Sequence, residues 1–342
     1  MLTQVHGGDI YRHKGVIDFS SNMNPLGTPE GVIRAAQESM TRISNYPDVF
    51  QTELIESIAA YEGVPAEQII CGNGAAELIF MFAAALRPKQ ALILAPTFAE
   101  YEQALHSAGC GVRLHTLREQ NGFTLTDSIL GDINSRLDVV ILCNPNNPTG
   151  RLVDPELLGR IIDRCKELGI WLMIDECFQD FCDAWTALSA KDRLADAPKL
   201  FLLKAFTKRY AMAGIRLGYG LCADEKMMDA MRRTVQPWNV SIPAQEAGIA
   251  ALKETAYVEE ARRIVKEERA FLKQELAGLG FTVYDSMANY IFFRGPEGLV
   301  EHALKSGILI RDCSNYHGLG RGYYRVAVRR HEDNVKLIEA LR

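Results

Sequence analysis

The chain has 342 residues, of which 48% are hydrophobic and 24% charged, and its formal net charge is -5. This length and composition predict a globular protein with a large core and two domains. The acidic balance, without a basic cluster interleaved with aromatic residues, gives no indication of a nucleic-acid or anionic-membrane partner. No apolar run reaches the length that spans a membrane.

The N-terminal residues and the cysteines bear on the cellular compartment. Residues 1–15 contain no apolar core of signal-peptide length, and their charges are scattered. The eight cysteines are dispersed without a C-x-x-C pair, which disfavours a zinc site or a redox dithiol. We therefore expect a cytoplasmic protein without a metal, whose cysteines are small buried apolar residues.

Helical and strand patterns alternate along the first two thirds of the chain. Apolar residues recur at helical spacing in residues 29–43, 51–63, 74–86 and 155–169. Short apolar runs predict buried strands at residues 68–72, 90–96, 138–145, 170–176, 199–206 and 215–222. This strand–helix–strand order predicts an α/β domain with a mostly parallel central sheet.

The pattern changes toward the C-terminus. A long charged amphipathic helix is predicted at residues 256–280. Strand patterns and a closing helix follow, at residues 288–295, 308–313, 323–329 and 332–342. These elements indicate a second, smaller α+β domain. We expect residues 1–40 to pack with this small domain as an N-terminal segment, residues 41–238 to form the large domain, and residues 239–342 to form the small domain.

A glycine-rich turn lies between a predicted strand and a predicted helix. Gly72 and Gly74 flank it, and ligands of open α/β sheets collect at the carboxyl ends of strands. The backbone N–H groups of Ala75 and Ala76 would begin the helix, at a positive end suited to a phosphate group. A tight turn without a ligand explains the same residues, and the glycine pattern alone favours that simpler interpretation.

Other predicted strands also end in residues suited to a site. Residues 144–150, Asn-Pro-Asn-Asn-Pro-Thr-Gly, predict a rigid turn that presents asparagine amides, although a plain loop explains them too. Asp175 follows an apolar run, where a carboxylate is costly to bury without a cation. A helix N-cap is the alternative for Asp175, and no nearby His favours a metal. Phe98 is either a core aromatic or a platform for a flat ring.

Two lysines and an arginine occur in residues 203–220. They are Lys204, Lys208 and Arg216. A lysine in a strand–loop–strand context, with an arginine shortly after it, is compatible with a covalent catalyst beside an anion-binding guanidinium. Taken alone, two solvated surface lysines are the more common explanation.

The order of the motifs resolves this choice by resemblance. NYPD, GNGAAEL, APTFAEY, NPNNPTG, IDE and TKRYAMAGIRLGYG occur in the order, and at about the spacing, seen in fold-type I pyridoxal-phosphate enzymes. Over nearly its whole length the chain resembles the aspartate aminotransferase-like superfamily and its histidinol-phosphate aminotransferase branch. The NPNNPTG and Lys-to-Arg motifs are specific to it, whereas the glycine turn is not. The resemblance implies pyridoxal 5'-phosphate as cofactor.

Further motifs are similar to one group within that branch. HGGDI, DFSSNMNPLG, DECFQDF, ILIRDCSNYHGLG and YYRVAVR resemble decarboxylases of cobalamin biosynthesis that act on O-phospho-L-threonine. The resemblance implies conversion of that small phosphorylated amino acid to aminopropanol phosphate and carbon dioxide. A histidinol-phosphate-type aminotransferase is the alternative. A non-catalytic binding protein is another, against which the complete set of Lys208, Asp175 and Arg216 argues. A nucleotide-binding protein lacks a fingerprint motif.

The resemblance assigns roles around the cofactor ring. It implies that Lys208 binds the cofactor covalently and serves as the catalytic acid, and that Asp175 keeps the ring nitrogen protonated. Asn147 would hydrogen-bond the ring hydroxyl, and Phe98 would stack on the ring.

The resemblance also assigns the cofactor phosphate. Arg216 would bind it together with the N–H groups that follow Gly74, at Ala75 and Ala76. Tyr46 matches a tyrosine that reaches the phosphate from a neighbouring subunit, which implies a homodimer with a shared active site.

Substrate contacts follow from the same comparison of motifs. Arg325 matches an arginine that binds the substrate carboxylate. Arg311, His6 and Asn24 are candidates for binding the substrate phosphate or for closing the site. Lys204 is expected to be a flanking positive charge or a solvated side chain.

Two positions depart from the superfamily pattern. Ala205 stands where a serine often binds the cofactor phosphate, so we expect Thr207 or a water molecule to compensate, or a weaker grip on the phosphate. Phe178 stands where aminotransferases commonly carry a tyrosine that bonds the ring hydroxyl. The loss of that hydroxyl argues against ordinary transamination.

Overall fold

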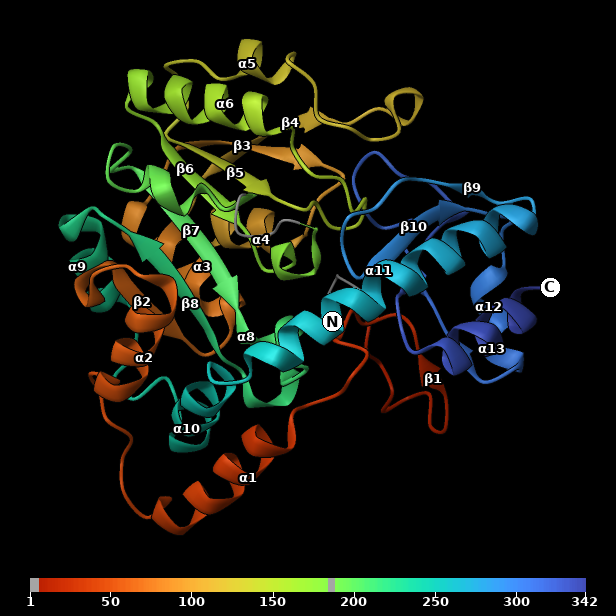
Figure 1. Cartoon of the computed structure of the whole chain (residues 1–342). Coiled ribbons are helices and arrows are strands. Elements are labelled where there is room, and N and C mark those ends of the chain that lie inside the picture. The colour runs from red at the N-terminus through yellow and green to blue at the C-terminus, as the bar shows by residue number, and fades with distance from the viewer. Residues whose placement is uncertain (1–5, 184–187) are drawn as a thin grey trace.

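The computed structural model describes residues 6–183 and 188–342, and a central seven-stranded sheet dominates it (Figure 1). The strand order is β2-β8-β7-β6-β5-β3-β4. The strands are β2 (Ile69–Gly72), β3 (Gln90–Ala95), β4 (Gly111–Thr116), β5 (Val139–Cys143), β6 (Trp171–Asp175), β7 (Leu200–Ala205) and β8 (Gly218–Cys222). Neighbours from β7 to β4 are parallel, whereas β8 runs antiparallel to β7 and β2. The predicted, mostly parallel α/β sheet is confirmed.

The strands are apolar throughout because helices cover both faces of the sheet. Successive residues of one strand point to opposite faces, so that Val140 and Ile141 belong to two different cores. One core contains residues of α2 (Thr52–Glu62), α6 (Pro155–Leu168) and α10 (Ile242–Ala251). The other contains residues of α3 (Ala75–Leu86), α4 (Glu100–Ser107) and α9 (Glu225–Thr234). The sheet edge is therefore held rigidly from both sides.

Helix α6 shows how local sequence sets the length of an element. Asp154 accepts hydrogen bonds from the N–H groups of Glu156 and Leu157 at 3.0 and 3.1 Å, and Pro155 opens the helix. Gly169 ends the helix in a left-handed conformation with φ of 67°. The helix predicted at residues 155–169 thus begins directly after its N-cap, Asp154, and ends directly before its C-cap, Gly169.

A smaller four-stranded antiparallel sheet forms the second domain, as predicted. Its strands β9 (Thr282–Val283), β10 (Tyr290–Arg294), β12 (Arg311–Asp312) and β13 (Tyr323–Ala327) lie in the order β12-β13-β10-β9. Its core includes residues of α11 (Thr255–Gly278), α12 (Leu299–Lys305) and α13 (His331–Leu341). Figure 1 shows α11 running from near α8, in the middle of the molecule, to this domain.

The N-terminal segment contacts both domains. Strand β1 (Ile17–Asp18) pairs with β11 (Ile308–Leu309), next to the small domain. Helix α1 (Glu30–Ser39) instead packs against α10, and α10 packs against α2 of the large domain. A boundary after α10 therefore fits the packing better than the expected one after residue 238, and the three-part division stays a proposal. In the described part of the chain, no helix combines the length and apolarity needed to cross a membrane.

Candidate active site

A cavity of about 300 Å³ lies between the large sheet, the small domain and the N-terminal segment. Cys143, Asp175 and Ala205, the last residues of the parallel strands β5, β6 and β7, line its floor. Parallel strands bring their carboxyl ends to one edge, which is why residues far apart in sequence meet here. The predicted site residues that line it are His6, Ala75, Ala76, Phe98, Asn147, Asp175, Thr207, Lys208, Arg216, Arg311 and Arg325.

Lys208 reaches the cavity from α8 (Phe206–Arg209), a short helix that directly follows β7. Burial, together with the guanidinium groups of Arg325 and Arg216, lowers the pKa of Lys208 to about 8. Its Nζ lies 5.9 Å from the centre of the Phe178 ring. A lysine with a lowered pKa has a larger neutral fraction near neutral pH, so its amine is a stronger nucleophile.

Asp175 is the buried acid of the site, with 5% of its surface exposed. The hydroxyl of Tyr101 donates to its Oδ2 at 2.5 Å, and the N–H of Cys177 donates to its Oδ1 at 2.9 Å. Burial raises the pKa of Asp175 above the usual value, and the neighbouring Glu176 adds to this, while the hydrogen bonds oppose it. Such a carboxylate is held rigidly and is ready to pair with a cation or a protonated ring nitrogen.

The start of α3 forms an anion-binding cradle. Gly74 precedes the helix with φ of 86° and no side chain caps the first turn. A Cβ on Gly74 would lie 2.4 Å from Nη2 of Arg216, so glycine is what lets the guanidinium approach the backbone here. Ala75 and Ala76 line the cavity at the positive helix end. Four of the predicted phosphate-binding residues therefore meet at one point.

The two neighbouring asparagines of the NPNNPTG turn, Asn146 and Asn147, have different hydrogen-bond partners. Asn146 is occupied within the protein, because its amide donates to Pro96 O and accepts from the Thr97 hydroxyl at 3.0 and 2.8 Å. Asn147 faces the cavity, and its Oδ1 accepts a hydrogen bond from Nη1 of Arg325. The turn thus places one amide at the site and uses the other to hold its own shape.

Arg311 and Arg325 lie directly opposite each other on the antiparallel strands β12 and β13. Each is 6% exposed. Nη2 of Arg325 donates to Ser20 O at 2.7 Å, and Nη2 of Arg311 donates to Asn315 Oδ1 at 2.9 Å. Like charges directly opposite each other destabilise a sheet. Two buried guanidinium groups at one end of a cavity are therefore the signature of an anionic ligand.

His6 and Glu100 close the same end of the cavity. Nδ1 of His6 lies 3.3 Å from Oε1 of Glu100, which links the N-terminal segment to α4. Oε2 of Glu100 is buried and has no hydrogen-bond partner among the described residues. Burial raises the pKa of Glu100 above the usual value, although His6 and Arg311 oppose the shift. Sequence patterns did not single out Glu100, since an acid in the first turn of a helix is unremarkable there.

Three predicted site residues are not among those that line the cavity: Gly74, which directly precedes α3, Tyr46 and Asn24. Tyr46 is 77% exposed, and its ring stacks on Trp238 with the centroids 4.4 Å apart. Asn24 is buried and hydrogen-bonds the chain around the lysine, because its N–H donates to Lys208 O at 3.2 Å and its amide donates to Arg209 O at 2.7 Å. Asn24 therefore contacts the backbone of α8 rather than the cavity.

The two departures from the superfamily pattern both line the cavity. Ala205 and Thr207 flank the start of α8, so a threonine hydroxyl is available beside the missing serine. Phe178 packs edge-on against Tyr290 with ring centroids 5.0 Å apart. A phenyl ring at this place brings no hydroxyl to the site.

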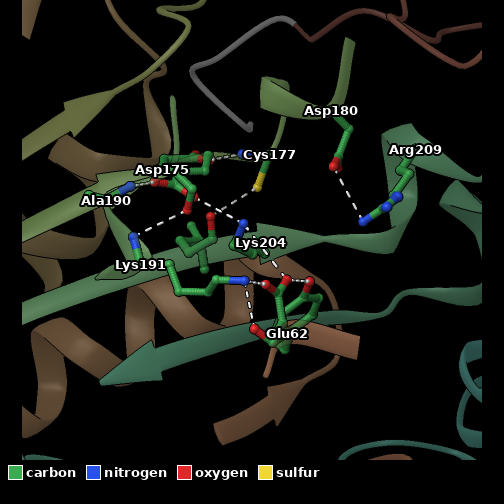
Figure 2. A network of polar contacts seen from close by, with 12 residues as sticks. Glu62, Asp175, Cys177, Asp180, Ala190, Lys191, Lys204 and Arg209 are labelled. Atoms are coloured by element: carbon green, nitrogen blue, oxygen red, sulfur yellow. Dashed lines mark hydrogen bonds and ion pairs between the residues drawn. The ribbon is translucent and has the colours of Figure 1, made fainter. Parts of the chain in front are cut away.

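Lys204 is buried rather than solvated, so of the two expectations from sequence the solvated side chain is wrong and the flanking positive charge fits. Its side chain is 10% exposed and its Nζ lies 3.0 Å from Oε2 of Glu176, within the polar network that Figure 2 shows. An apolar strand pattern predicts burial of the residue but gives no information about a distant acidic partner. Arg209, Glu62 and Glu176 were missed for the same reason.

Comparison with known proteins identifies the family to which this chain belongs. The model of the family described as aminotransferase class I and II matches residues 14–341. The chain belongs to this family. It is 41% identical to threonine-phosphate decarboxylase of Salmonella typhimurium, with 100% of this chain and 97% of that protein covered. It is 33% identical to a histidinol-phosphate aminotransferase of Nitratidesulfovibrio vulgaris, over 95% of this chain and 87% of that protein.

Solved structures show the same fold. A histidinol-phosphate aminotransferase from Clostridium acetobutylicum has a TM-score of 0.88 at 32% identity, covering 94% of this chain and 97% of that one. The L-threonine-O-3-phosphate decarboxylase from Porphyromonas gingivalis has a TM-score of 0.84 at 26% identity, with the same coverage. These likenesses confirm the fold-type I architecture expected from the motifs.

Enzymes of this family use pyridoxal phosphate, and this chain is a pyridoxal-phosphate-dependent enzyme. The residues present fit the cofactor. Ala75 and Ala76, at the start of α3, line the cavity together with Arg216, whose guanidinium packs against Gly74, and this arrangement suits the cofactor phosphate. Asp175 supplies a buried carboxylate and Lys208 an amine of lowered pKa, both facing one cavity.

Proposed function

We propose that the chain removes carbon dioxide from O-phospho-L-threonine to give aminopropanol phosphate, a step of cobalamin biosynthesis. The 41% identity to threonine-phosphate decarboxylase over the full chain supports this reaction. A second relative, from Caldanaerobacter subterraneus and named a putative threonine-phosphate decarboxylase, is 39% identical over 98% of this chain. Aminotransferase relatives match at lower identity, which favours the decarboxylase over the histidinol-phosphate-type aminotransferase.

The observation that carries the proposal is the pair of buried arginines. O-Phospho-L-threonine has two anionic groups, a carboxylate and a phosphate. Arg325, beside Asn147, would hold the carboxylate, and Arg311, with His6 nearby, would hold the phosphate. Two guanidinium groups opposite each other match a substrate with two anions better than a substrate with one.

The residues of the cofactor end divide the chemical work. When bound, pyridoxal phosphate supplies an electron-withdrawing ring that stabilises negative charge on the α-carbon of the substrate. Lys208 would hold the cofactor and Arg216, with the α3 amides, would hold its phosphate. Asp175 would keep the ring nitrogen protonated. After the carboxylate has left as carbon dioxide, Nζ of Lys208 would give the α-carbon the proton that replaces it.

Substrate orientation then decides which bond is broken. The arginines fix the carboxylate relative to the cofactor, and displacements of about 1 Å at this point can change rates about a hundredfold. Phe178 brings no hydroxyl to the site, which agrees with a reaction other than ordinary transamination.

The proposal is tested by a side-by-side assay of the purified, cofactor-loaded enzyme. O-Phospho-L-threonine and histidinol phosphate are supplied separately, the latter with 2-oxoglutarate, and carbon dioxide and glutamate are both measured. We expect carbon dioxide from phosphothreonine and no glutamate from histidinol phosphate. Glutamate production without carbon dioxide would instead establish the aminotransferase.

We further propose a homodimer with a shared active site. A band of exposed apolar side chains supports it: Met40, Ile43, Tyr46 and Phe50 are 51%, 59%, 77% and 78% exposed. Patches of this kind are typical of interfaces. Mixing Tyr46→Ala and Lys208→Ala chains should restore activity if Tyr46 serves the neighbouring site. A monomeric mass by light scattering, with no restored activity, would reject the shared site.

We also propose that the protein acts in the cytoplasm. All eight cysteines are free and buried, which suits a reducing compartment. Fractionation of the source cells, followed by immunoblotting, tests this location, and recovery outside the cytoplasm would contradict it.

A further inference from the structure

Lys204 lies in β7, shortly before Lys208, and is buried among acidic groups (Figure 2). Its Nζ lies 3.0 Å from Oε2 of Glu176 and 3.7 Å from Oε1 of Glu62. Those two side chains are 0% and 4% exposed. Burial opposes the charge on Lys204, but the two carboxylates outweigh it and raise the pKa of the amine above its ordinary value. The lysine is therefore a buried cation with two anionic partners.

The two carboxylates have further partners. Oε1 of Glu62 accepts from the Tyr219 hydroxyl at 2.5 Å, and its Oε2 lies 3.2 Å from Nζ of Lys191. Oε1 of Glu176 accepts from the N–H of Ala190 at 2.9 Å. Buried ion pairs are stable only when the remaining hydrogen-bonding capacity is met in this way. Removing one partner would leave charge unmatched inside the protein.

Arg209, at the end of α8, is held by residues from the same two segments. Its Nη1 lies 3.3 Å from Oδ1 of Asp180, and its guanidinium carbon lies 4.7 Å from the centre of the Tyr61 ring. Tyr61 is the neighbour of Glu62 in α2, and Asp180 follows Glu176 in the turn after β6. The end of α2 and the turn after β6 thus each contact two cations. One is Lys204, which precedes Lys208 in the sequence, and the other is Arg209, which follows it.

That turn begins at the other reacting group. Asp175 is the last residue of β6, so the segment that positions it also supplies the acidic partners of Lys204 and Arg209. Within this cluster the charges balance, with three acids and three cations. They are Glu62, Glu176 and Asp180, and Lys191, Lys204 and Arg209.

We propose that Lys204 and Arg209 are positioning residues, whose buried ion pairs fix the Lys208 amine relative to the Asp175 carboxylate and keep the surrounding charge balanced. Within the described part of the chain, neither is among the residues that line the cavity. They act through the backbone of β7 and α8, on which Lys208 sits. The inference rests on the proposed function in taking Lys208 and Asp175 as the reacting groups.

The test compares charge-altering variants of the full-length, cofactor-loaded enzyme. Lys204→Met should lower kcat by about tenfold or more and change KM by less than about threefold, because the catalytic amine is displaced. It should also raise the pH midpoint of the cofactor's visible absorbance by roughly half a unit, since two carboxylates lose their cation. Glu176→Gln should shift that midpoint in the opposite direction.

Two further variants distinguish an electrostatic role of Lys204 from a role in packing alone: one restores the charge balance and the other keeps the charge. In the double variant Lys204→Met with Glu176→Gln the midpoint should return toward the wild-type value, because one charge of each sign is gone. Lys204→Arg keeps the charge and should recover most of the lost kcat. Lys166→Met is the matched control, since its pair with Asp196 is 3.2 Å long but about half exposed, and it should change neither readout.

Unchanged values overturn the proposal. It fails if folded Lys204→Met and Glu176→Gln both keep kcat within about twofold and shift the midpoint in the same direction or not at all. If Lys204→Met does not fold, Glu176→Gln and Arg209→Met, which also removes one buried cation, carry the same readouts and the same criterion. The absorbance midpoint needs no substrate. Shifted midpoints without carbon dioxide release by the wild type would therefore reject the proposed reaction and retain this inference.

Discussion

The cofactor end of the cavity and its substrate end are built in different ways. At the cofactor end, Asp175 is the last residue of β6 and Lys208 lies in α8, directly after the neighbouring strand β7, and the carboxylate has two hydrogen-bond donors. The substrate end joins the N-terminal segment, α4 and the small sheet through His6, Glu100 and Arg325. Its residues come from nearly the whole length of the chain.

The difference extends to hydrogen bonding. At the substrate end, Nε of Arg325, Oε2 of Glu100 and Oδ1 of Asn22 are buried without a partner among the described residues. Buried polar atoms without partners are costly, so a ligand that meets them gains that free energy on binding. The cofactor end is thus organised by the fold itself, whereas the substrate end leaves hydrogen-bonding capacity for the molecule that it selects.

The largest expected effect comes from disabling the cofactor end. Lys208→Ala should lower turnover by about a thousandfold or more, because in the proposed mechanism it removes both the covalent attachment and the catalytic acid. Borohydride reduction followed by mass spectrometry should no longer find cofactor on the peptide that contains residue 208. Full turnover by this variant would contradict the assignment, and Lys199→Met, at the other end of β7, serves as the control.

A smaller loss is expected from Asp175→Asn, which keeps the shape of the side chain and removes its charge. Turnover should fall by about a hundredfold, as when one preorganised electrostatic partner is lost elsewhere. Cofactor affinity, measured by absorbance titration, should fall as well. Equal turnover in wild type and variant would show that the buried carboxylate has no part in the reaction.

The same variant should behave differently without cofactor. The pKa of Asp175 is raised in the fold, so the stability it contributes is present at acid pH and is lost as pH rises through that raised pKa. The amide that replaces the carboxyl group in the variant has no such proton to lose. The cofactor-free Asp175→Asn protein should therefore melt at a higher temperature than the wild type at alkaline pH, with the gap closing in acid.

Arg325→Lys tests the substrate end with its charge retained. A lysine lacks the planar fork that reaches Asn147 and Ser20 together. KM for phosphothreonine should rise by about tenfold to a hundredfold, while cofactor absorbance stays unchanged. Arg321→Lys is the control, because the Arg321 side chain is 82% exposed and its pair with Glu297 is 3.5 Å long. An unchanged KM would move the carboxylate site elsewhere.

Sequence patterns predicted the sheet well because its strands are buried on both faces. Runs such as residues 138–145 and 170–176 are apolar throughout, and that pattern survives in any tertiary context. Strand β4 was not predicted, since it lies at the sheet edge with only one neighbour and carries Arg113 and His115. Alternation was too weak there to stand out.

The site was predictable only where motifs are local. Ala75 and Asn147 each lie in a short motif whose resemblance to the family implied a role, and both line the cavity. The opposition of Arg311 and Arg325 depends on the register of two strands, and the partners of Lys204 lie far away in the chain. Long-range pairing of this kind leaves no periodic signal in the sequence.

The smallest expected effect concerns Glu100, whose charge should affect substrate binding and leave the cofactor end unchanged. Burial raises the pKa of its carboxyl group, so the group becomes charged only as pH rises through a value above the ordinary one. Once charged, it would compete with the substrate anions for Arg311, the proposed phosphate-binding residue. Above that pKa, Glu100→Gln should therefore lower KM for phosphothreonine by about threefold to tenfold, since a nearby charge in a watery cavity is worth about 1 kcal/mol. Below it, wild type and variant should have equal KM, and kcat should be unaffected throughout.

Glu102→Gln is the comparison for Glu100→Gln, because Glu102 also pairs with a histidine, His317, at 2.8 Å. If both variants behaved alike at every pH, the effect would come from the histidine pairs that join α4 to its neighbours, and the buried charge of Glu100 would have no selective role.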